Sequence, residues 1–245
     1  MKNILLIGEG EVGSALKRIE EEAGNKVYVL DLKYLTKPDA SLGYDVCHVN
    51  IPYSERFIEI VDGYAKSYNP GLLIINSTVP LGVTSKVRKA TKLPTVHSPI
   101  RGVHPNLYEG VKTFSKIIGG VTKDTKLADE HFVSIGLKTA VYGSSKESEL
   151  AKLLCTTYYG WNILFAKQVS LMCKKYGLNY DNVYKDFNIS YNEGYSKLGK
   201  SNVVRPVLVP PEGLIGGHCV GNNFELLPRS KLKKFAKKMN EDHSL

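Results

Sequence analysis

The sequence predicts an α/β fold, a Rossmann-type mostly parallel sheet followed by a helical domain built on one long helix. Short apolar runs alternate with helical segments up to residue 143, and a glycine-rich turn follows the first run. The segment 146–175 contains no proline and one glycine. Alternating strands and helices are typical of a parallel sheet covered on both faces. We therefore expect a sheet domain over 1–143 and a helical domain over 144–245.

Strands are expected where compact apolar runs are bounded by turn-forming residues. The expected strands are 2–7, 26–32, 45–51, 71–76, 94–97, 115–118 and 138–142. The expected helices between them are 14–23, 53–68, 82–91 and 123–135. The stretch 33–44 is too short for a full helix and a further strand, so one crossover is expected to be trimmed.

The helical domain begins with apolar residues at helical spacing over 146–175, which predicts one helix of ~45 Å. In a monomer, a helix this long would expose a large apolar patch. We therefore expect a homodimer joined through it. Further helices are expected at 180–188 and 224–239, with a long Gly-, Pro- and Asn-rich loop over 191–222.

Composition excludes several classes of protein. Four dispersed cysteines without a CxxC pair argue against a disulfide framework or a zinc ribbon. The histidines show no HExxH spacing, so no metal is expected. No apolar run approaches the ~20 residues of a membrane span. The first apolar run is too short for a signal peptide, so we expect a cytoplasmic protein without membrane contact.

The net charge of +9 is unevenly distributed, because residues 229–238 hold six cations. Mild basicity suits anionic small-molecule substrates. The basic segment is interpreted as the solvated face of a terminal helix. Nucleic acid or an acidic membrane is the alternative partner, but nucleic-acid binding is not expected.

The motif Gly8-Glu9-Gly10-Glu11-Val12-Gly13 fits the GxGxxG pattern of dinucleotide-binding folds. It follows an expected strand and opens an expected helix, which is the context this pattern requires. One glycine makes the tight turn, the second admits the pyrophosphate, and the third allows close packing of helix and strand. The expected cofactor contacts here are Gly8, Gly10, Glu11, Val12 and Gly13.

Asp31 lies near the end of the second expected strand and could accept hydrogen bonds from an adenosine ribose. A carboxylate there repels a 2′-phosphate and favours NAD over NADP. Lys33 lies nearby and could weaken this discrimination. Asp31 could instead be a turn or cap residue.

Two further expected strands are followed by Pro52 and by Ser77-Thr78. Ligands of such folds bind at the carboxyl ends of the strands. Pro52 and Thr78 are therefore included among the expected cofactor contacts, although a Ser-Thr-Val-Pro sequence is often only a turn.

Cys219 follows Gly216-Gly217-His218 in the long loop, where a thiolate could approach a ligand as a nucleophile. Lys152, on the long helix, would by itself be read as a solvated charge. Neither residue alone establishes a catalytic role.

Taken in order, these segments resemble the UDP-glucose/GDP-mannose dehydrogenase family. Besides the glycine motif, the matching stretches are Ser77-Thr78-Val79-Pro80-x-Gly82-x-Thr84, His97-Ser98-Pro99-x-Arg101, Lys116-Ile117-Ile118-Gly119-Gly120, Glu149-Leu150-x-Lys152-Leu153 and Pro211-x-Gly213-x-x-Gly216-Gly217-His218-Cys219.

The resemblance implies that two NAD⁺ oxidise a sugar-nucleotide alcohol to an acid. It assigns Cys219 as the nucleophile that traps the aldehyde and forms a thioester, Lys152 as the group that stabilises oxyanion charge, and Thr78 as a neighbour of the nicotinamide.

The sequence departs from the family where carboxylates or their partners are expected, at Ile100, His104, Thr156 and Asn223. His104 remains a possible catalytic base. The family's C-terminal domain, which closes over the nucleotide, would begin where this chain ends at 245. The alternative to a dehydrogenase is therefore an NAD-binding module with degenerate catalysis, acting as a regulatory or partner subunit.

Overall fold

The computed structural model describes residues 1–102, 105–211, 213 and 220–241. The chain divides into two compact units, Met1–Lys152 and Leu153–Leu245, and helix α6 (Ser145–Tyr176) contributes residues to both. Within the described residues, no helix is long and apolar enough to cross a membrane.

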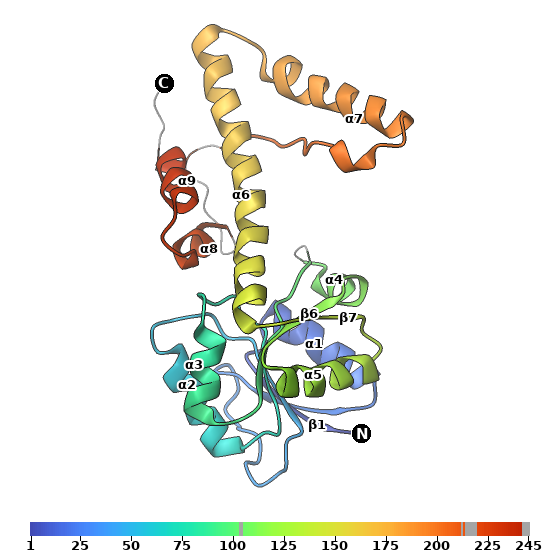
Figure 1. The fold of residues 1–245 in the computed structure, drawn as a ribbon, viewed down its shortest axis with the longest axis vertical. Helices are drawn as coiled ribbons and strands as arrows, with labels where there is room; N and C mark the ends of the chain where they lie inside the picture. Colours follow the sequence, from blue (N-terminus) through green and yellow to red (C-terminus); the bar gives the residue numbers. More distant parts are fainter. Residues whose placement is uncertain (103–104, 212, 214–219, 242–245) are drawn as a thin grey trace. The chain divides into compact units, whose positions relative to one another are not determined.

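The first unit is built on a seven-stranded sheet with the strand order β2-β1-β3-β4-β5-β6-β7 (Figure 1). All neighbouring strands are parallel except β5 and β6, which confirms the mostly parallel sheet. The strands are β1 (Asn3–Ile7), β2 (Lys26–Leu30), β3 (Val46–Val49), β4 (Leu73–Ile75), β5 (Thr95–His97), β6 (Lys116–Gly119) and β7 (Thr139–Tyr142).

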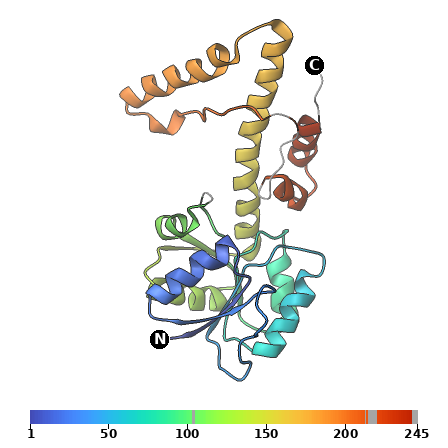
Figure 2. The ribbon, with the colours of Figure 1, turned by 180° about the vertical axis from the view of Figure 1, so that it is seen from behind.

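Helices cover both faces of this sheet, and the alternation of side chains along β1 shows how. Ile4 and Leu6 pack with one set of helices, whereas Leu5 and Ile7 pack with the other. The first set is α1 (Glu11–Glu22), α4 (Leu107–Thr113) and α5 (Thr122–Ser134). The second set, on the opposite face in both views (Figure 2), is α2 (Phe57–Tyr68) and α3 (Val83–Thr91).

Two connections differ from those of a regular alternating fold. No helix lies between β2 and β3, which confirms the trimmed crossover. Helix α4 was not expected from the sequence. Leu107 and Val111 lie one turn apart in it and are both buried in the core, so two well-placed apolar side chains stabilise it despite the nearby Pro105 and Gly110.

The second unit is organised along the greater part of α6. Helices α8 (Val220–Leu226) and α9 (Lys231–Glu241) pack around Leu164, and Trp161 stacks on Phe235 with ring centroids 5.2 Å apart. Nearer the end of α6, Cys173 is buried with Tyr184.

Two expectations for this unit were wrong. A helix is present at the expected 180–188, as the π-helical segment η1 (Asp181–Asp186) followed by α7 (Phe187–Lys197), but it continues to Lys197, so the loop expected from residue 191 begins later. A short 3₁₀ turn η2 (Ser201–Val203) follows. The helix expected at 224–239 is divided into α8 and α9, because Pro228 cannot continue a helix and Ser230 caps the next one by accepting the Lys233 amide at 3.1 Å.

Candidate functional site

The glycine loop joins β1 to α1 in a conformation that only glycine fits. Gly8 has φ +85°, in the left-handed region. A Cβ on Gly13 would lie 2.1 Å from the Gly8 carbonyl oxygen, so this position tolerates no side chain. In contrast, a Cβ on Gly10 would meet no atom within 4 Å. The loop is therefore closed against the protein and open in front of Gly10, as a cradle for a dinucleotide requires.

Asp31 lies directly behind this loop, one residue after β2. Its Oδ2 accepts a hydrogen bond from the Glu9 amide at 2.6 Å, and its Oδ1 accepts one from the Lys33 amide at 3.0 Å. These two backbone hydrogen bonds lower the pKa of the Asp31 carboxyl. The predicted ribose-binding carboxylate is thus ionised, oriented and adjacent to the glycine loop.

The other expected cofactor residues lie at the ends of β3 and β4 and at the start of α1. Pro52 and Glu11 are exposed, while Thr78 and Val12 are half-buried. The neighbouring Ser77 hydroxyl donates to the Ile51 carbonyl at 2.6 Å, which ties the end of β4 to the end of β3.

Two lysines hold three successive carbonyls after β5. Lys116 Nζ donates to the Ser98 and Pro99 oxygens at 3.0 and 3.4 Å, and Lys152 Nζ donates to the Ile100 oxygen at 2.8 Å. Burial, followed by repulsion from Lys152 and Arg101, lowers the pKa of Lys116 to about 7. The structure thus places Lys152 against the segment that the resemblance connects with catalysis.

The side chain of Ile100 faces the hydrophobic core rather than Lys152. It is 5 % exposed and packs in the cluster that includes Leu107, Val111 and Ile118. A carboxylate at this position would have to leave the core to act on a substrate. The position is therefore structural in this chain.

Buried His97 connects the end of β5 to two other parts of the first unit. Its Nε2 donates to the Ser77 carbonyl at 3.2 Å, and its Nδ1 lies 2.9 Å from the Ser148 hydroxyl on α6. Burial lowers the pKa of His97 to about 3, so the ring is neutral and has a structural role.

In the second unit, Thr156 and Asn223 contact each other. Asn223 Nδ2 donates to Thr156 Oγ1 at 3.1 Å, and Asn223 is buried. An amide and a hydroxyl cannot take a proton from water at neutral pH. This pair therefore supplies positioning but no general base.

Two expected catalytic residues, Cys219 and His104, lie outside the described residues. Of the other cysteines, Cys47 and Cys173 are buried, whereas Cys155 is exposed on α6.

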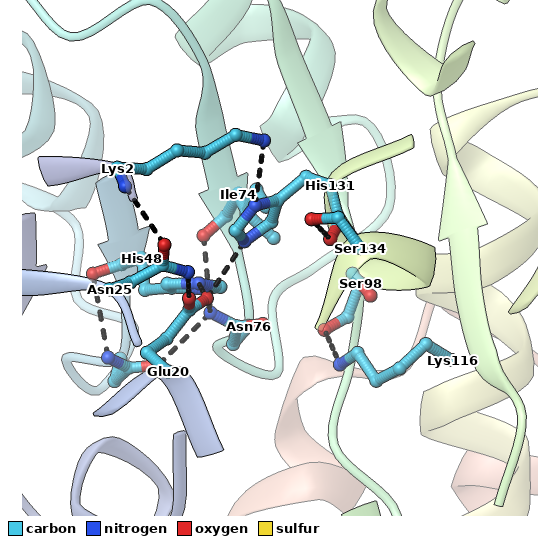
Figure 3. Close-up of polar contacts among 11 residues, drawn as sticks. Lys2, Glu20, Asn25, His48, Ile74, Asn76, Ser98, Lys116, His131 and Ser134 are labelled. Atoms are coloured by element: carbon cyan, nitrogen blue, oxygen red, sulfur yellow. Dashed lines mark hydrogen bonds and ion pairs between the residues drawn. The ribbon is translucent and has the colours of Figure 1, made fainter. Parts of the chain in front are cut away.

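A buried polar cluster between strand β3 and helices α1 and α5 was missed by sequence reasoning (Figure 3). Glu20 Oε1 lies 3.0 Å from His48 Nε2 and 2.8 Å from His131 Nε2. Asn76 Nδ2 donates to His48 Nδ1, and Lys2 Nζ faces His131 Nδ1. Since both Nδ1 atoms face donors, both Nε2 atoms carry hydrogen and donate to Glu20. Glu20 and the two imidazoles therefore form a hydrogen-bonded network, beside which the buried Oδ1 of Asn76 has no partner among the described residues.

This network reaches the glycine loop through two asparagines. Asn76 Nδ2 also donates to Asn50 Oδ1 at 3.1 Å, and Asn50 Nδ2 donates to the Gly8 carbonyl at 3.4 Å. The residues come from α1, β3, α5 and the positions directly after β3 and β4, and they are far apart in the sequence, so no local spacing could have revealed them.

Comparisons with known proteins agree with this architecture. No family model matches the chain. Among curated proteins, it is 25 % identical to the UDP-N-acetyl-D-mannosamine dehydrogenase of Methanocaldococcus jannaschii over 236 residues, 88 % of this chain and 52 % of that protein. The enzyme of the same name from Pyrococcus horikoshii is 25 % identical over 259 aligned positions, 98 % of this chain and 55 % of that protein. The chain thus spans about half the length of these relatives.

Solved structures share the fold. That of the Pyrococcus horikoshii UDP-D-ManNAc dehydrogenase matches with a TM-score of 0.76 and 21 % identity, over 98 % of this chain and 68 % of that one. A UDP-glucose dehydrogenase from Pyrobaculum islandicum matches with a TM-score of 0.73 and 17 % identity, over 98 % and 68 % respectively. These structures confirm the fold, and the sequence relatives support the resemblance of the chain to the UDP-glucose/GDP-mannose dehydrogenase family.

Proposed function

We propose that this protein binds NAD and oxidises an alcohol of a nucleotide sugar, with UDP-N-acetyl-D-mannosamine as the first candidate substrate. Two findings together carry the proposal. The glycine loop is open in front of Gly10 and is hydrogen-bonded to Asp31, and UDP-N-acetyl-D-mannosamine dehydrogenases match most of the chain in sequence. When bound, NAD⁺ would accept the hydride released in each oxidation.

The chain's own groups would hold the dinucleotide along the carboxyl edge of the sheet. Gly8, Gly10 and Gly13, with the first amides of α1 at Glu11 and Val12, would receive the pyrophosphate. Asp31 would accept the ribose hydroxyls, and Pro52 and Thr78 would contact the nicotinamide half.

Lys152 would stabilise negative charge on the substrate oxygen during oxidation. Its ammonium group already donates to a backbone carbonyl, so exchange of that acceptor for a developing alkoxide strengthens the hydrogen bond as charge appears. Lys116 would keep the Ser98 and Pro99 carbonyls in place beside it.

Cys219 would carry the second half-reaction. Its thiolate adds to the aldehyde carbon and forms a thiohemiacetal, loss of a second hydride leaves a thioester, and water then cleaves the carbon–sulfur bond to release the acid and the thiol. His104 is the candidate base for this water, because imidazole titrates near neutral pH.

A second candidate function is an NAD-binding subunit with incomplete catalysis. Two observations favour it, namely the Ile100 side chain within the core and the Asn223–Thr156 pair without a titratable oxygen. In this case the protein would bind NAD and the nucleotide sugar but would form little acid.

We further infer a homodimer through α6. Exposed apolar side chains are concentrated on its Leu153–Tyr176 portion, which in a monomer would leave a sizeable patch in water. They are Leu154, Tyr158, Tyr159, Phe165, Met172 and Tyr176. Light scattering at micromolar concentration should give about twice 27.2 kDa; a monomer that persists on concentration would refute the dimer.

The enzyme proposal is tested by a spectrophotometric screen for NADH with UDP-N-acetyl-D-mannosamine, UDP-glucose and GDP-mannose. NADH formation that depends on one of them is expected, and it should disappear in the Cys219→Ala, Lys152→Met double variant. NAD binding without NADH from any sugar nucleotide would favour the second candidate. Absence of NAD binding would contradict both.

A further inference from the structure

We propose that Glu9 is a coenzyme-specificity residue, whose carboxylate neutralises Lys33 and Lys17 and thereby keeps the adenosine site selective for NAD over NADP. This inference rests on the proposed function, because it requires the glycine loop to bind a nicotinamide dinucleotide.

Glu9 occupies the position between the first two glycines of the loop, yet its side chain is only 7 % exposed. Its Oε1 lies 3.0 Å from Lys17 Nζ on α1, and its Oε2 lies 3.0 Å from Lys33 Nζ. Tyr34 donates its hydroxyl to Oε2 as well. The two oxygens of the Glu9 carboxylate thus contact two ammonium groups and one phenol hydroxyl.

The same residues frame Asp31, the expected ribose acceptor. Asp31 holds the backbone amides of Glu9 and Lys33, one on each oxygen. Each oxygen keeps acceptor capacity for a ribose hydroxyl, since a carboxylate oxygen has two lone pairs. Lys33 therefore lies beside the place where the 2′-phosphate of NADP would come.

Charge decides which coenzyme this arrangement accepts. Glu9, Asp31, Lys17 and Lys33 carry two negative and two positive charges, so the group is neutral. Without the Glu9 charge the group would be net positive, because the ammonium groups of Lys17 and Lys33 would lose their ion-pair partner. The 2′-phosphate of NADP could then form ion pairs that are not available while Glu9 is charged.

The neutralisation is permanent rather than a pH switch. Burial alone would raise the pKa of Glu9, but hydrogen bonds from Tyr34, Lys17 and Lys33 outweigh it and lower the pKa to about 2. Lys33 also donates to the Glu9 carbonyl at 3.1 Å, but that neutral acceptor does not cancel its charge.

Calorimetric titration of the full chain with NAD⁺, NADP⁺, 5′-AMP and 2′,5′-ADP tests the proposal. The variants are Glu9→Gln, Glu9→Gln with Lys33→Met, and the control Glu22→Gln. The control removes a carboxylate from the same loop–helix element, where it pairs with Arg18 at 2.9 Å. Glu9→Gln should tighten NADP⁺ and 2′,5′-ADP by about tenfold while NAD⁺ and 5′-AMP change by less than about threefold.

Adding Lys33→Met should cancel that gain, and Glu22→Gln should leave both affinities unchanged. Lys33→Met in the wild-type chain gives an independent measurement if Glu9→Gln fails to fold: NADP⁺ should bind more weakly by less than about threefold, because Glu9 already cancels most of the attraction of Lys33 and the variant adds only one net negative charge at an exposed site. Unchanged NADP⁺ binding in folded Glu9→Gln, or a tenfold loss in Lys33→Met, would overturn the role of Glu9. Failure of the wild type to bind any of the four probes would instead overturn the proposed function.

Discussion

The coenzyme edge of the sheet and the region matched to acid formation use their polar groups differently. At the coenzyme edge, Asp31 is ionised, held by two backbone amides and next to an open glycine loop. At the positions that the resemblance connects with acid formation, Ile100 is buried in the core of the first unit, and within the second unit Asn223 is paired with Thr156. The coenzyme edge thus presents charges and donors to a ligand, whereas these three side chains hold structure and carry no titratable oxygen.

The largest loss of activity is expected from Lys152→Met, which removes the cation proposed to face the substrate oxygen. Loss of one such donor lowers turnover by about 10²–10³-fold. Lys146→Met, an exposed lysine near the start of the same helix, is the matched control. NADH formation under saturating substrate measures the effect, and calorimetry should show unchanged NAD⁺ affinity. A loss of less than about tenfold would remove Lys152 from the proposed mechanism.

Glycine substitutions separate folding from coenzyme binding at the first region. Gly10→Ala meets no protein atom within 4 Å, so it should fold normally but weaken NAD⁺ by about tenfold or more, because the new methyl occupies the cradle. Gly13→Ala should also lower stability, since its Cβ would lie 2.1 Å from the Gly8 oxygen. Melting temperature and calorimetric affinity distinguish the two. Normal NAD⁺ affinity in Gly10→Ala would contradict the cradle.

The first unit should lose stability in acid. Burial lowers the pKa of His48 and brings that of His97 to about 3, and hydrogen bonds from His131 and His48 overcome burial to lower that of Glu20. A group whose pKa is lower in the folded than in the unfolded state stabilises the fold fully at pH values above its unfolded pKa. This stabilisation is lost as the pH falls. Stability should therefore decline below about pH 6.5, by about 1.4 kcal/mol per pH unit for each such histidine.

Hydrogen exchange of sheet amides between pH 7 and 5 measures this decline. His97→Asn should reduce the dependence of the opening free energy on pH by the contribution of one histidine. A pH-independent opening free energy in this range would contradict the depressed pKa values, because it requires the two rings to bind protons equally in the folded and unfolded states.

The smallest effect is expected from Gly63→Ala in the exposed part of α2, where a Cβ would meet nothing within 4 Å. Replacing glycine within a helix should stabilise the first unit by about 0.5–1 kcal/mol. Catalysis and coenzyme affinity should not change. This variant shows how far a change in the stability of the first unit, without a change at the coenzyme edge, affects coenzyme affinity and catalysis.

Local patterns predicted the parts of the fold that depend on neighbouring residues. The seven strands and the long helix follow from short apolar runs and helical spacing, and the glycine loop from its context after β1. The division between α8 and α9 could have been predicted from Pro228, but the sequence analysis expected one helix over 224–239. The Glu20–His48–His131 cluster and the ties of Glu9 to Lys17 and Lys33 join side chains brought together by the fold. Such pairings have no local signature, so only the structure reveals them.

Product stoichiometry tests the central proposal, that the protein binds NAD and carries out the first oxidation but forms the acid slowly. In a single turnover with the active nucleotide sugar, NADH formed per substrate consumed is compared with the intact mass of the protein. We predict incomplete or delayed acid release, with an acyl adduct on Cys219, and faster release in Asn223→Asp because a carboxylate restores a base worth about 10²–10⁴ in rate. Two NADH per substrate, with free acid released at the rate of the first oxidation and no adduct, would contradict the account.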